Sequence, residues 1–340
     1  MHGKPPSTAA VGRAARLAGA VVQEIRELAG GTHAYTYLTR TAGPEQEFIL
    51  REFPPGDDAA RDEVRVLTAL DGLDGLAPRL LARGAGGNPS EGSWLLISRL
   101  PGAADITPGQ PATWAAQLGE ALARVHATPM RRLTGFVSVF HRSRSSLAPV
   151  SGPAASVVAA NRDLLTSAPA VLTHSDYWSG NTLWDGARIT GVVDWSGGCL
   201  GPRGFDVGWC RLDLYLLYGE DIADTFLGSY QTASKSALPD VLLWDLWAVA
   251  RSHEHVESWV PNYGDLGRAD LTAGELRKRH SAWTGHLVNS IGKSLDPRRR
   301  LDAQSDPIDK RGSTISLGSR AIMPGNGPDL ATSPVQSDRG

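Results

Sequence analysis

The chain has 340 residues, enough for one large domain or two lobes, because globular domains usually span roughly 100 to 200 residues. Hydrophobic residues make up 41% of the chain, charged residues make up 21%, and the formal net charge is -2. These values exclude a chain that is disordered throughout and a strongly basic nucleic-acid binder, so a globular protein is expected.

Cysteine content and terminal sequence bear on the compartment. Cys199 and Cys210 are too few for a disulfide framework, and no Cys/His cluster has zinc-ligand spacing, so a reducing cytoplasm is expected. Residues 1–6 lack the apolar stretch of a signal peptide, and no run of about 18 apolar residues is present to span a bilayer. We expect neither a membrane nor a nucleic-acid partner.

The first hundred residues are expected to form an antiparallel sheet with one helix. β-branched and aromatic residues predict strands over residues 20–28, 34–39, 47–53, 79–83 and 93–99. Residues 58–73 instead have the 3.6-residue spacing of an amphipathic helix, with Glu63 on its apolar face. Because an acid on a buried face needs a partner, Glu63 is expected to be paired.

The Pro101-Gly102 pair marks a break in the chain, and the boundary between two lobes is expected there. Beyond it, helices are predicted over residues 113–127, 154–165, 207–218, 239–259 and 272–291, with a β-rich region over residues 171–195. From Lys293 onward the sequence is polar and lacks periodicity. The predicted organisation is an N-terminal lobe (1–100), a C-terminal lobe (101–292) and a disordered tail (293–340).

The β-rich region carries polar residues that suit phosphoryl transfer. Asp176 and Asn181 have the five-residue spacing of a protein-kinase catalytic loop, and Asp194 ends an apolar strand. A carboxylate at the start of the loop is placed to orient a hydroxyl and take its proton, so Asp176 is the candidate base. Mg²⁺ prefers oxygen ligands, for which Asn181 and Asp194 are candidates. His174 is expected to brace the loop by a hydrogen bond, because no second histidine stands at metal-ligand spacing.

Three segments, HSDYWSGNTLW, GVVDW and GPRGFDVGW, together resemble the aminoglycoside phosphotransferase family of protein-kinase-like small-molecule kinases. The N-terminal part agrees with this resemblance. Residues 30–35 resemble the nucleotide-covering turn of the family, residues 48–51 its third strand, Glu63 its paired helix acid, and residues 94–102 its hinge.

The resemblance implies an α+β fold of the bilobal protein-kinase-like type, with an antiparallel sheet and one helix in the N-terminal lobe and a mainly helical C-terminal lobe. It implies transfer of phosphate from ATP or GTP to a hydroxyl of a small molecule, with Asp176 as base and Mg²⁺ on Asn181 and Asp194. His174 and Asp206 would support the catalytic loop. The implied nucleotide-binding residues are Gly31, Thr32, Arg51 (paired with Glu63), Ser98, Arg99 and Leu100.

Several positions depart from the family pattern, and two of them are Ser175 and Arg51. Ser175 stands where the family usually has glycine, and a serine is tolerated there unless the position needs a positive φ. Arg51 stands where protein kinases and several antibiotic kinases have lysine; it keeps the charge but differs in reach.

The acceptor is left open between an aminoglycoside, another antibiotic, and a metabolite such as an amino alcohol or a sugar. Trp178, in the catalytic loop, is a candidate to border it. A set of acids would suit a cationic acceptor: Asp206, Glu254, Glu257, Asp265 and Asp270. The alternative function is a pseudokinase-like regulator that binds nucleotide or ligand without turnover; the sequence does not distinguish ATP from GTP or indicate an oligomeric state.

Overall fold

The computed structural model describes residues 21–28, 34–42, 46–84, 92–141, 149–238 and 240–294, with a few positions before residue 21. The chain divides into two units, Met1–Leu295 and Asp296–Gly340, and every element below belongs to the first. Two predicted nucleotide-binding residues, Gly31 and Thr32, lie outside the described residues, as does the predicted tail from residue 295 onward.

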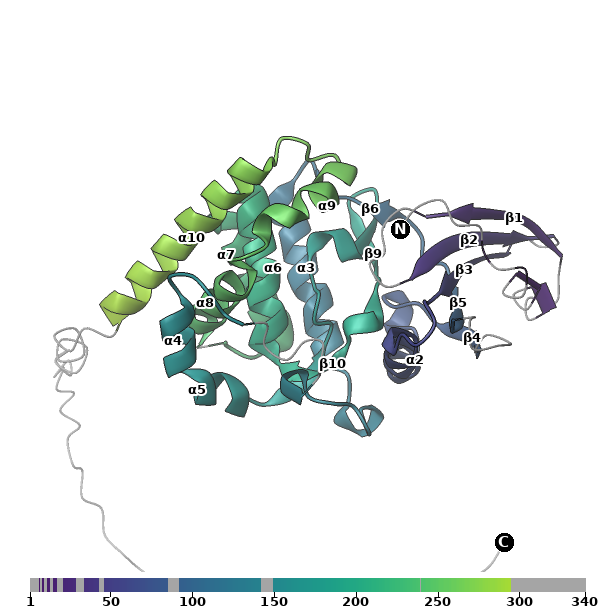
Figure 1. Cartoon of the computed structure of the whole chain (residues 1–340), viewed down its shortest axis with the longest axis horizontal. Helices are drawn as coiled ribbons and strands as arrows, with labels where there is room; N and C mark the ends of the chain where they lie inside the picture. Colours follow the sequence, from purple (N-terminus) through teal and green to yellow (C-terminus); the bar gives the residue numbers. More distant parts are fainter. Residues whose placement is uncertain are drawn as a thin grey trace, which may run out of the picture. The chain divides into compact units, whose positions relative to one another are not determined.

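The N-terminal part forms a five-stranded antiparallel sheet in the order β1-β2-β3-β5-β4 (Figure 1). Its strands are β1 (Val22–Glu27), β2 (Tyr35–Thr41), β3 (Gln46–Glu52), β4 (Leu80–Gly84) and β5 (Trp94–Ser98). Each overlaps a predicted strand. The central strand β3 carries Arg51, whose neighbours in the sheet are Thr36 of β2 and Leu95 of β5.

Helix α2 (Ala59–Leu70) contacts β4 and β5 on one side and the short turn η5 (Trp195–Gly197) on the other. Its apolar residues recur at helical spacing, and Glu63 lies among them with only 1% of its surface exposed. The predicted place of Glu63 on the buried face is therefore confirmed. The helix ends at Asp71, which adopts a left-handed conformation.

The rest of the chain is mainly helical (Figure 1). Its longer helices are α3 (Pro111–His126), α6 (Arg203–Tyr218), α7 (Glu220–Ser234), α8 (Val241–Ser252) and α10 (Ala273–Ser294). Helix α3 packs along α7, and α6 packs on α7 and α8. Trp244, Trp247 and Trp283 are buried in the core that these helices share. Among the described residues, no helix has the length and apolar character needed to cross a membrane.

The helical part differs from the predictions in places. Helix α7 was not predicted, and the helix expected over residues 154–165 is divided at Asn161 into α4 (Ala155–Ala160) and α5 (Arg162–Ser167). The Asn161 side chain donates to the carbonyl of Val157, so it competes with the backbone at the break. The helix expected over 239–259 ends at Ser252 and is followed by η6 (Val256–Trp259) and α9 (Val260–Asp265).

Two small sheets accompany the helices, and most of their strands lie between α5 and α6 in the chain. The predicted β-rich region contains β7 (Ala170–Thr173), β8 (Thr182–Asp185) and β9 (Arg188–Val192). Strand β7 pairs with β10 (Cys199–Pro202), and β8 lies between β9 and β6 (Ala103–Ala104). At the predicted break, Gly102 has φ +89°, and a Cβ there would lie 2.3 Å from the carbonyl oxygen of Trp184. Only glycine fits this close approach.

Candidate active site

One buried carboxylate, that of Asp206, holds the loop that joins β7 to β8. Asp206, in the first turn of α6, accepts hydrogen bonds from the backbone N–H groups of His174 (2.7 Å) and Ser175 (2.8 Å). Asp206 is fully buried, and its Oδ2 atom lies 3.1 Å from Nε2 of His126. Nε2 of His174 lies 2.9 Å from the carbonyl oxygen of Val193, so the loop is also tied to the segment after β9.

The loop backbone is strained at its first turn. Ser175 has φ +70°, in the left-handed region that favours glycine. The condition under which serine is disfavoured at this position is therefore met. The Ser175 hydroxyl lies 3.0 Å from Sγ of Cys199 and 3.3 Å from Oγ1 of Thr173, contacts that offset part of the strain.

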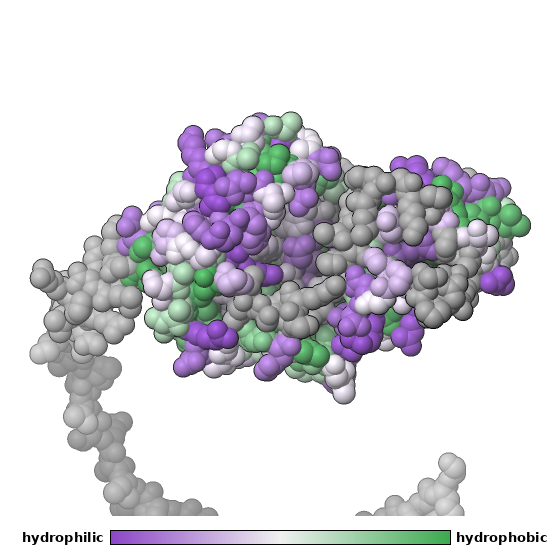
Figure 2. Space-filling model, in the orientation of Figure 1, coloured by the Kyte–Doolittle hydropathy of each residue, from purple (hydrophilic) through white to green (hydrophobic). Residues whose placement is uncertain are grey.

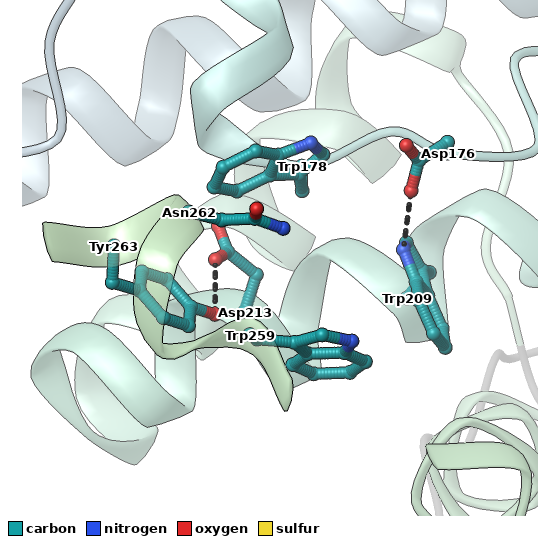
Figure 3. Close-up of a pocket in the computed structure, with 7 residues that line it drawn as sticks. All are labelled: Asp176, Trp178, Trp209, Asp213, Trp259, Asn262 and Tyr263. Atoms are coloured by element: carbon teal, nitrogen blue, oxygen red, sulfur yellow. Dashed lines mark hydrogen bonds between the residues drawn. The ribbon is translucent and has the colours of Figure 1, made fainter. Parts of the chain in front are cut away.

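The next residue, Asp176, has an exposed side chain, and each oxygen of its carboxylate accepts a hydrogen bond. Nε1 of Trp209 donates to Oδ1 at 3.1 Å (Figure 3), and Nδ2 of Asn181 approaches Oδ2 at 3.3 Å. The protein walls around the carboxylate raise its pKa by desolvation, and Asp194 adds to this. Opposing effects come from His174, the Trp209 hydrogen bond and Arg251. A raised pKa makes the carboxylate a better proton acceptor.

Asp194 lies at the end of an ion-pair chain that joins the sheet, α2 and the segment after β9. Arg51 donates through Nη1 to Oε1 of Glu63 and through Nη2 to Oδ1 of Asp194, the latter at 3.0 Å. Burial raises the pKa of Glu63 to about 7, although Arg51 counteracts it. Burial also opposes the charge of Asp194, but the pair with Arg51 outweighs it and lowers the Asp194 pKa.

Asn181 and Asp194 have oxygen atoms to spare for a cation. Oδ1 of Asp194 accepts from Arg51 and from Ser196 Oγ (3.1 Å), and Oδ2 is the second oxygen of the same carboxylate. The amide nitrogen of Asn181 donates to the Asp176 carbonyl at 2.9 Å, which leaves its oxygen free. The N–H of Val193 donates to the Asn181 carbonyl at 2.9 Å, which brings the two segments together. Hard oxygen donors of this kind fit Mg²⁺, which takes only one or two protein carboxylates and completes its shell with water and phosphate.

Next to Asp176 lies a pocket of about 400 Å³, its open mouth included. Three indoles and a set of polar groups line it (Figure 3): Asp176, Trp178, Trp209, Asp213, Trp259, Asn262 and Tyr263. Asp213 accepts from the backbone N–H of Ser179 at 3.0 Å and from the Tyr263 hydroxyl at 2.9 Å. Burial raises the pKa of Asp213. The candidate base Asp176 therefore lines a pocket whose walls are largely aromatic.

The sequence was compared with models of protein families. The model described as "Phosphotransferase enzyme family" matches residues 24–251, about two thirds of the chain. The chain belongs to this family. A search of curated protein sequences found no match.

Solved structures share the fold of this phosphotransferase. A candidate aminoglycoside phosphotransferase from Ralstonia eutropha JMP134 has a TM-score of 0.60 at 16% identity, covering 84% of this chain and 98% of its own. Macrolide 2′-phosphotransferase MphH from Brachybacterium faecium has a TM-score of 0.52 at 20% identity, with coverage of 81% and 96%. Aminoglycoside phosphotransferase APH(4)-Ia, solved with AMP-PNP and hygromycin B, has a TM-score of 0.53 at 17% identity, with coverage of 82% and 98%. At these identities the similarity shows a common kinase-like fold.

The predicted hinge of the phosphotransferase, residues 94–102, consists of β5 and the residues that follow it. Ser98 accepts a hydrogen bond from the backbone N–H of Arg79 at 2.9 Å, and Arg99 is paired with Glu47 at the surface. Both side chains are thus engaged within the N-terminal lobe. Leu100 packs over β9, where a Cβ on Gly191 would lie 2.4 Å from its Cδ1 atom. Of the three, Leu100 is the one whose side chain reaches the second lobe.

The acids expected to attract a cationic acceptor do not line the pocket. Asp206 is buried beneath the catalytic loop, Glu257 is bonded to Arg277 at 2.5 and 2.6 Å, and Asp270 to Arg268 at 2.8 Å. Glu254 and Asp265 are exposed and belong to neither wall of the pocket. The expectation is wrong because these side chains either have partners within the fold or point to solvent.

Most of the pocket was not found by sequence reasoning, which named only Trp178 and Asp176. Trp209 lies in the GPRGFDVGW segment, three residues after Asp206, so one helical turn of spacing placed it on the same side of α6. Trp259 comes from η6, which the helix predicted over residues 239–259 did not separate from α8, and Tyr263 comes from α9, which was not predicted.

Proposed function

We propose that this phosphotransferase transfers the γ-phosphoryl group of ATP or GTP to a hydroxyl of a small molecule held in the pocket of Figure 3. The observation that carries the proposal is the position of Asp176. Its carboxylate lines the pocket, is oriented by Trp209 and Asn181, and shares its loop with the free oxygen of Asn181. An acceptor in the pocket and a nucleotide held at Asn181 and Asp194 would then meet at Asp176.

In this reaction Asp176 accepts the proton of the acceptor hydroxyl. The hydroxyl oxygen forms a bond to the γ-phosphorus, the bond from the γ-phosphorus to its bridging oxygen breaks, and the nucleoside diphosphate leaves with that electron pair. Trp209 and Asn181 keep the carboxylate aimed, so that little reorganisation is needed when the acceptor arrives.

Asn181 and Asp194 would hold Mg²⁺, which neutralises the phosphate charges when bound. Arg51 is fixed between Glu63 and Asp194, so it sets the position of the Asp194 carboxylate and adds a positive charge beside it. Leu100 would contact the base of the nucleotide at the hinge. Gly31 and Thr32 would cover its phosphates, as the family resemblance implies.

The pocket favours a compact acceptor with an apolar face over a polycation. Its walls are three indoles, and the carboxylate of Asp213 already has two donors. The guanidinium of Arg251 lies 5.0 Å from the Trp209 ring and places a positive charge behind that wall. A hydroxylated ring such as a sugar, or a small amino alcohol, would satisfy this lining. The activities named for the similar structures, on macrolides and aminoglycosides, support a small hydroxylated acceptor as a class.

Calorimetric titration of the wild type with AMP-PNP in excess Mg²⁺ tests the nucleotide half of the proposal. Asp194→Asn should weaken binding about tenfold or more, because one charge-assisted metal contact is lost. Asp176→Asn is the matched control and should bind AMP-PNP like the wild type, because Asp176 serves the acceptor. Equal affinities in Asp194→Asn and the wild type, or no binding to the wild type, would contradict the assignment.

A further inference from the structure

A second cavity lies away from the catalytic loop, on the outer side of α2. Four arginines from three elements line it: Arg61 and Arg65 of α2, Arg83 of β4, and Arg132 of η2 (Met130–Arg132). Asp71 is the one acid among the lining residues. We call this cavity the α2 groove; it measures about 1280 Å³, its open side included. Hydrophilic residues dominate the surface over α2 in Figure 2.

The arginines of the α2 groove are only loosely tied within the fold. Arg61 approaches Asp58 at 3.3 Å with both side chains more than 60% exposed, and Arg65 approaches Asp62 at 3.4 Å. Such surface pairs contribute little to stability. Arg132 makes one bond to the carbonyl of Ala69 at 3.3 Å, and no described acid lies within ion-pair distance of Arg83. Most of their N–H donors are therefore available to a ligand.

The four arginines repel one another across the groove. A bound anion would relieve this repulsion. Guanidinium groups match phosphate geometry because two parallel N–H donors reach two oxygens. At about 1280 Å³, its open side included, the groove has room for more than a single phosphate. Its floor includes Val64 and Phe136, with the guanidinium of Arg65 5.9 Å from the Phe136 ring. The contact with Phe136 orients the Arg65 guanidinium, which can then bind a phosphate chain.

We propose that the α2 groove binds an oligophosphate anion at a site separate from the catalytic cleft. The anion would bridge Arg61 and Arg65 on α2 to Arg132, which follows the lobe break at residues 101–102. Arg132 already contacts the last turn of α2 through Ala69, so the ligand strengthens an existing link.

The position of α2 makes the site a regulator of the cleft. Glu63 precedes Val64 of the groove floor, and on the inner side of α2 it holds Arg51, which in turn holds Asp194. An anion that fixes α2 against η2 therefore favours the arrangement that binds nucleotide. We expect the oligophosphate to tighten nucleotide binding about five- to tenfold, the lower range of allosteric coupling. This second effect rests on the proposed function; binding in the groove does not.

Inorganic tripolyphosphate is the probe, titrated by calorimetry into the full chain with Mg²⁺ in excess. Asp194→Asn is used as the background, so that binding of the probe in the cleft is weakened about tenfold or more. In this background the chain should bind one tripolyphosphate, and Arg61→Ala/Arg132→Ala should weaken binding by about tenfold or more, because at least one charge-assisted contact is lost. Arg131→Ala is the matched control. Arg131 neighbours Arg132 in η2 but does not line the groove, so its loss should leave the affinity unchanged.

Three results would overturn the groove proposal. They are no binding of tripolyphosphate, an affinity in the double variant equal to that of its background, and a loss in Arg131→Ala as large as that in the double variant, which would indicate general charge attraction. The coupling is read separately, from AMP-PNP titrations of the wild type with and without tripolyphosphate. An unchanged AMP-PNP affinity in the presence of a filled groove overturns the regulatory effect. Failure of AMP-PNP to bind at all counts against the proposed function and leaves the groove result intact.

Discussion

Ser175 and Asp194 both adopt left-handed backbone conformations, with φ of +70° and +62°, on two segments that meet at the candidate active site. Strain of this kind persists where the surrounding structure fixes the backbone. At Ser175 the two N–H bonds to Asp206 come from this residue and its neighbour His174. The carboxylate beneath the loop thus enforces a conformation that the serine side chain resists.

Ser175→Gly should stabilise the protein by about 1 kcal/mol, because glycine adopts positive φ without the clash of a Cβ. For a domain of this size that corresponds to a rise in Tm of about 2–4 °C. Ser229→Gly in α7 is the matched control and should lower Tm, since glycine weakens a regular helix. Differential scanning calorimetry measures both; a fall in Tm for Ser175→Gly comparable to that of the control would show that the hydroxyl contacts outweigh the strain.

Among the elements, α7 packs on α3 through an unusually close approach. A Cβ at Gly119 of α3 would lie 2.5 Å from the Phe226 carbonyl oxygen and 2.7 Å from the Tyr230 backbone nitrogen. The contact also brings the Tyr230 hydroxyl within 2.8 Å of His126, the histidine next to Asp206. Helix α7 is therefore connected to the catalytic loop through three buried side chains.

Gly119→Ala should destabilise the protein by about 1–3 kcal/mol, because the added methyl forces α7 away from α3. Gly228→Ala, in α7 itself, has nothing within 4 Å of the new Cβ and should gain about 0.5–1 kcal/mol from helix propensity. Urea unfolding followed by tryptophan fluorescence compares the two. Equal effects of the two substitutions would refute the close-packing explanation.

A buried ion pair links α6 to α8 and responds to pH. Arg211 Nε lies 3.0 Å from both carboxylate oxygens of Asp245, and burial raises the pKa of Asp245 to about 6 in spite of that partner. In the unfolded chain this carboxyl titrates near 4. Between these values the folded state binds more protons than the unfolded state, so the Asp245 contribution to the unfolding free energy falls as pH rises from about 4 to about 6.

Asp245→Asn removes this titration. We expect the wild type to lose about 2 kcal/mol of stability relative to Asp245→Asn between pH 4 and pH 7, because the pKa difference between folded and unfolded states disappears in the variant. Urea unfolding of both proteins across this range provides the measurement. A difference in stability that is constant with pH would show that Asp245 stays ionised in the folded state.

Local patterns in the sequence account for the N-terminal sheet and the catalytic loop, whereas tertiary contacts account for most of what was missed. The strands around Arg51 have β-branched runs bounded by turns, and the spacing from Asp176 to Asn181 lies within one loop. Helix α7 has apolar residues at helical spacing, Ala223, Phe226 and Tyr230, which the sequence reading overlooked, whereas its close fit against α3 at Gly119 is a tertiary contact that no local pattern shows. The acceptor pocket draws Trp209 and Trp259 from separate helical segments, so no local spacing joins them.

For the whole molecule, Arg51 is the residue that connects the sheet, α2 and the segment after β9. It is 4% exposed and bonds both Glu63 and Asp194. Arg51 and Asp194 are charged, Glu63 ionises near neutral pH, and Arg51 and Glu63 are buried, so removing one group leaves the others without compensation. The contact that holds the Asp194 carboxylate therefore also stabilises the junction of the two lobes.

Arg51→Met should destabilise the protein by about 3 kcal/mol or more, because Glu63 is left buried without a partner. Arg51→Met/Glu63→Leu replaces the pair by apolar side chains and should recover a large part of that loss. Chemical unfolding of the two variants gives the comparison. A double variant no more stable than Arg51→Met would mean that the pair with Asp194, rather than the one with Glu63, dominates.

In the proposed reaction Asp176 takes the proton of a hydroxyl while the nucleotide is bound at Asn181 and Asp194. The most direct test is ³¹P NMR of ATP or GTP with Mg²⁺, the chain and a panel of hydroxylated sugars, amino alcohols, macrolides and aminoglycosides. The wild type should convert at least one acceptor into a phosphomonoester with equimolar nucleoside diphosphate, and Asp176→Asn, which keeps its AMP-PNP affinity, should form none. Two results would contradict this mechanism. One is a wild type that binds nucleotide but forms no more phosphomonoester than Asp176→Asn with any acceptor, and the other is an Asp176→Asn variant that transfers phosphate at the wild-type rate.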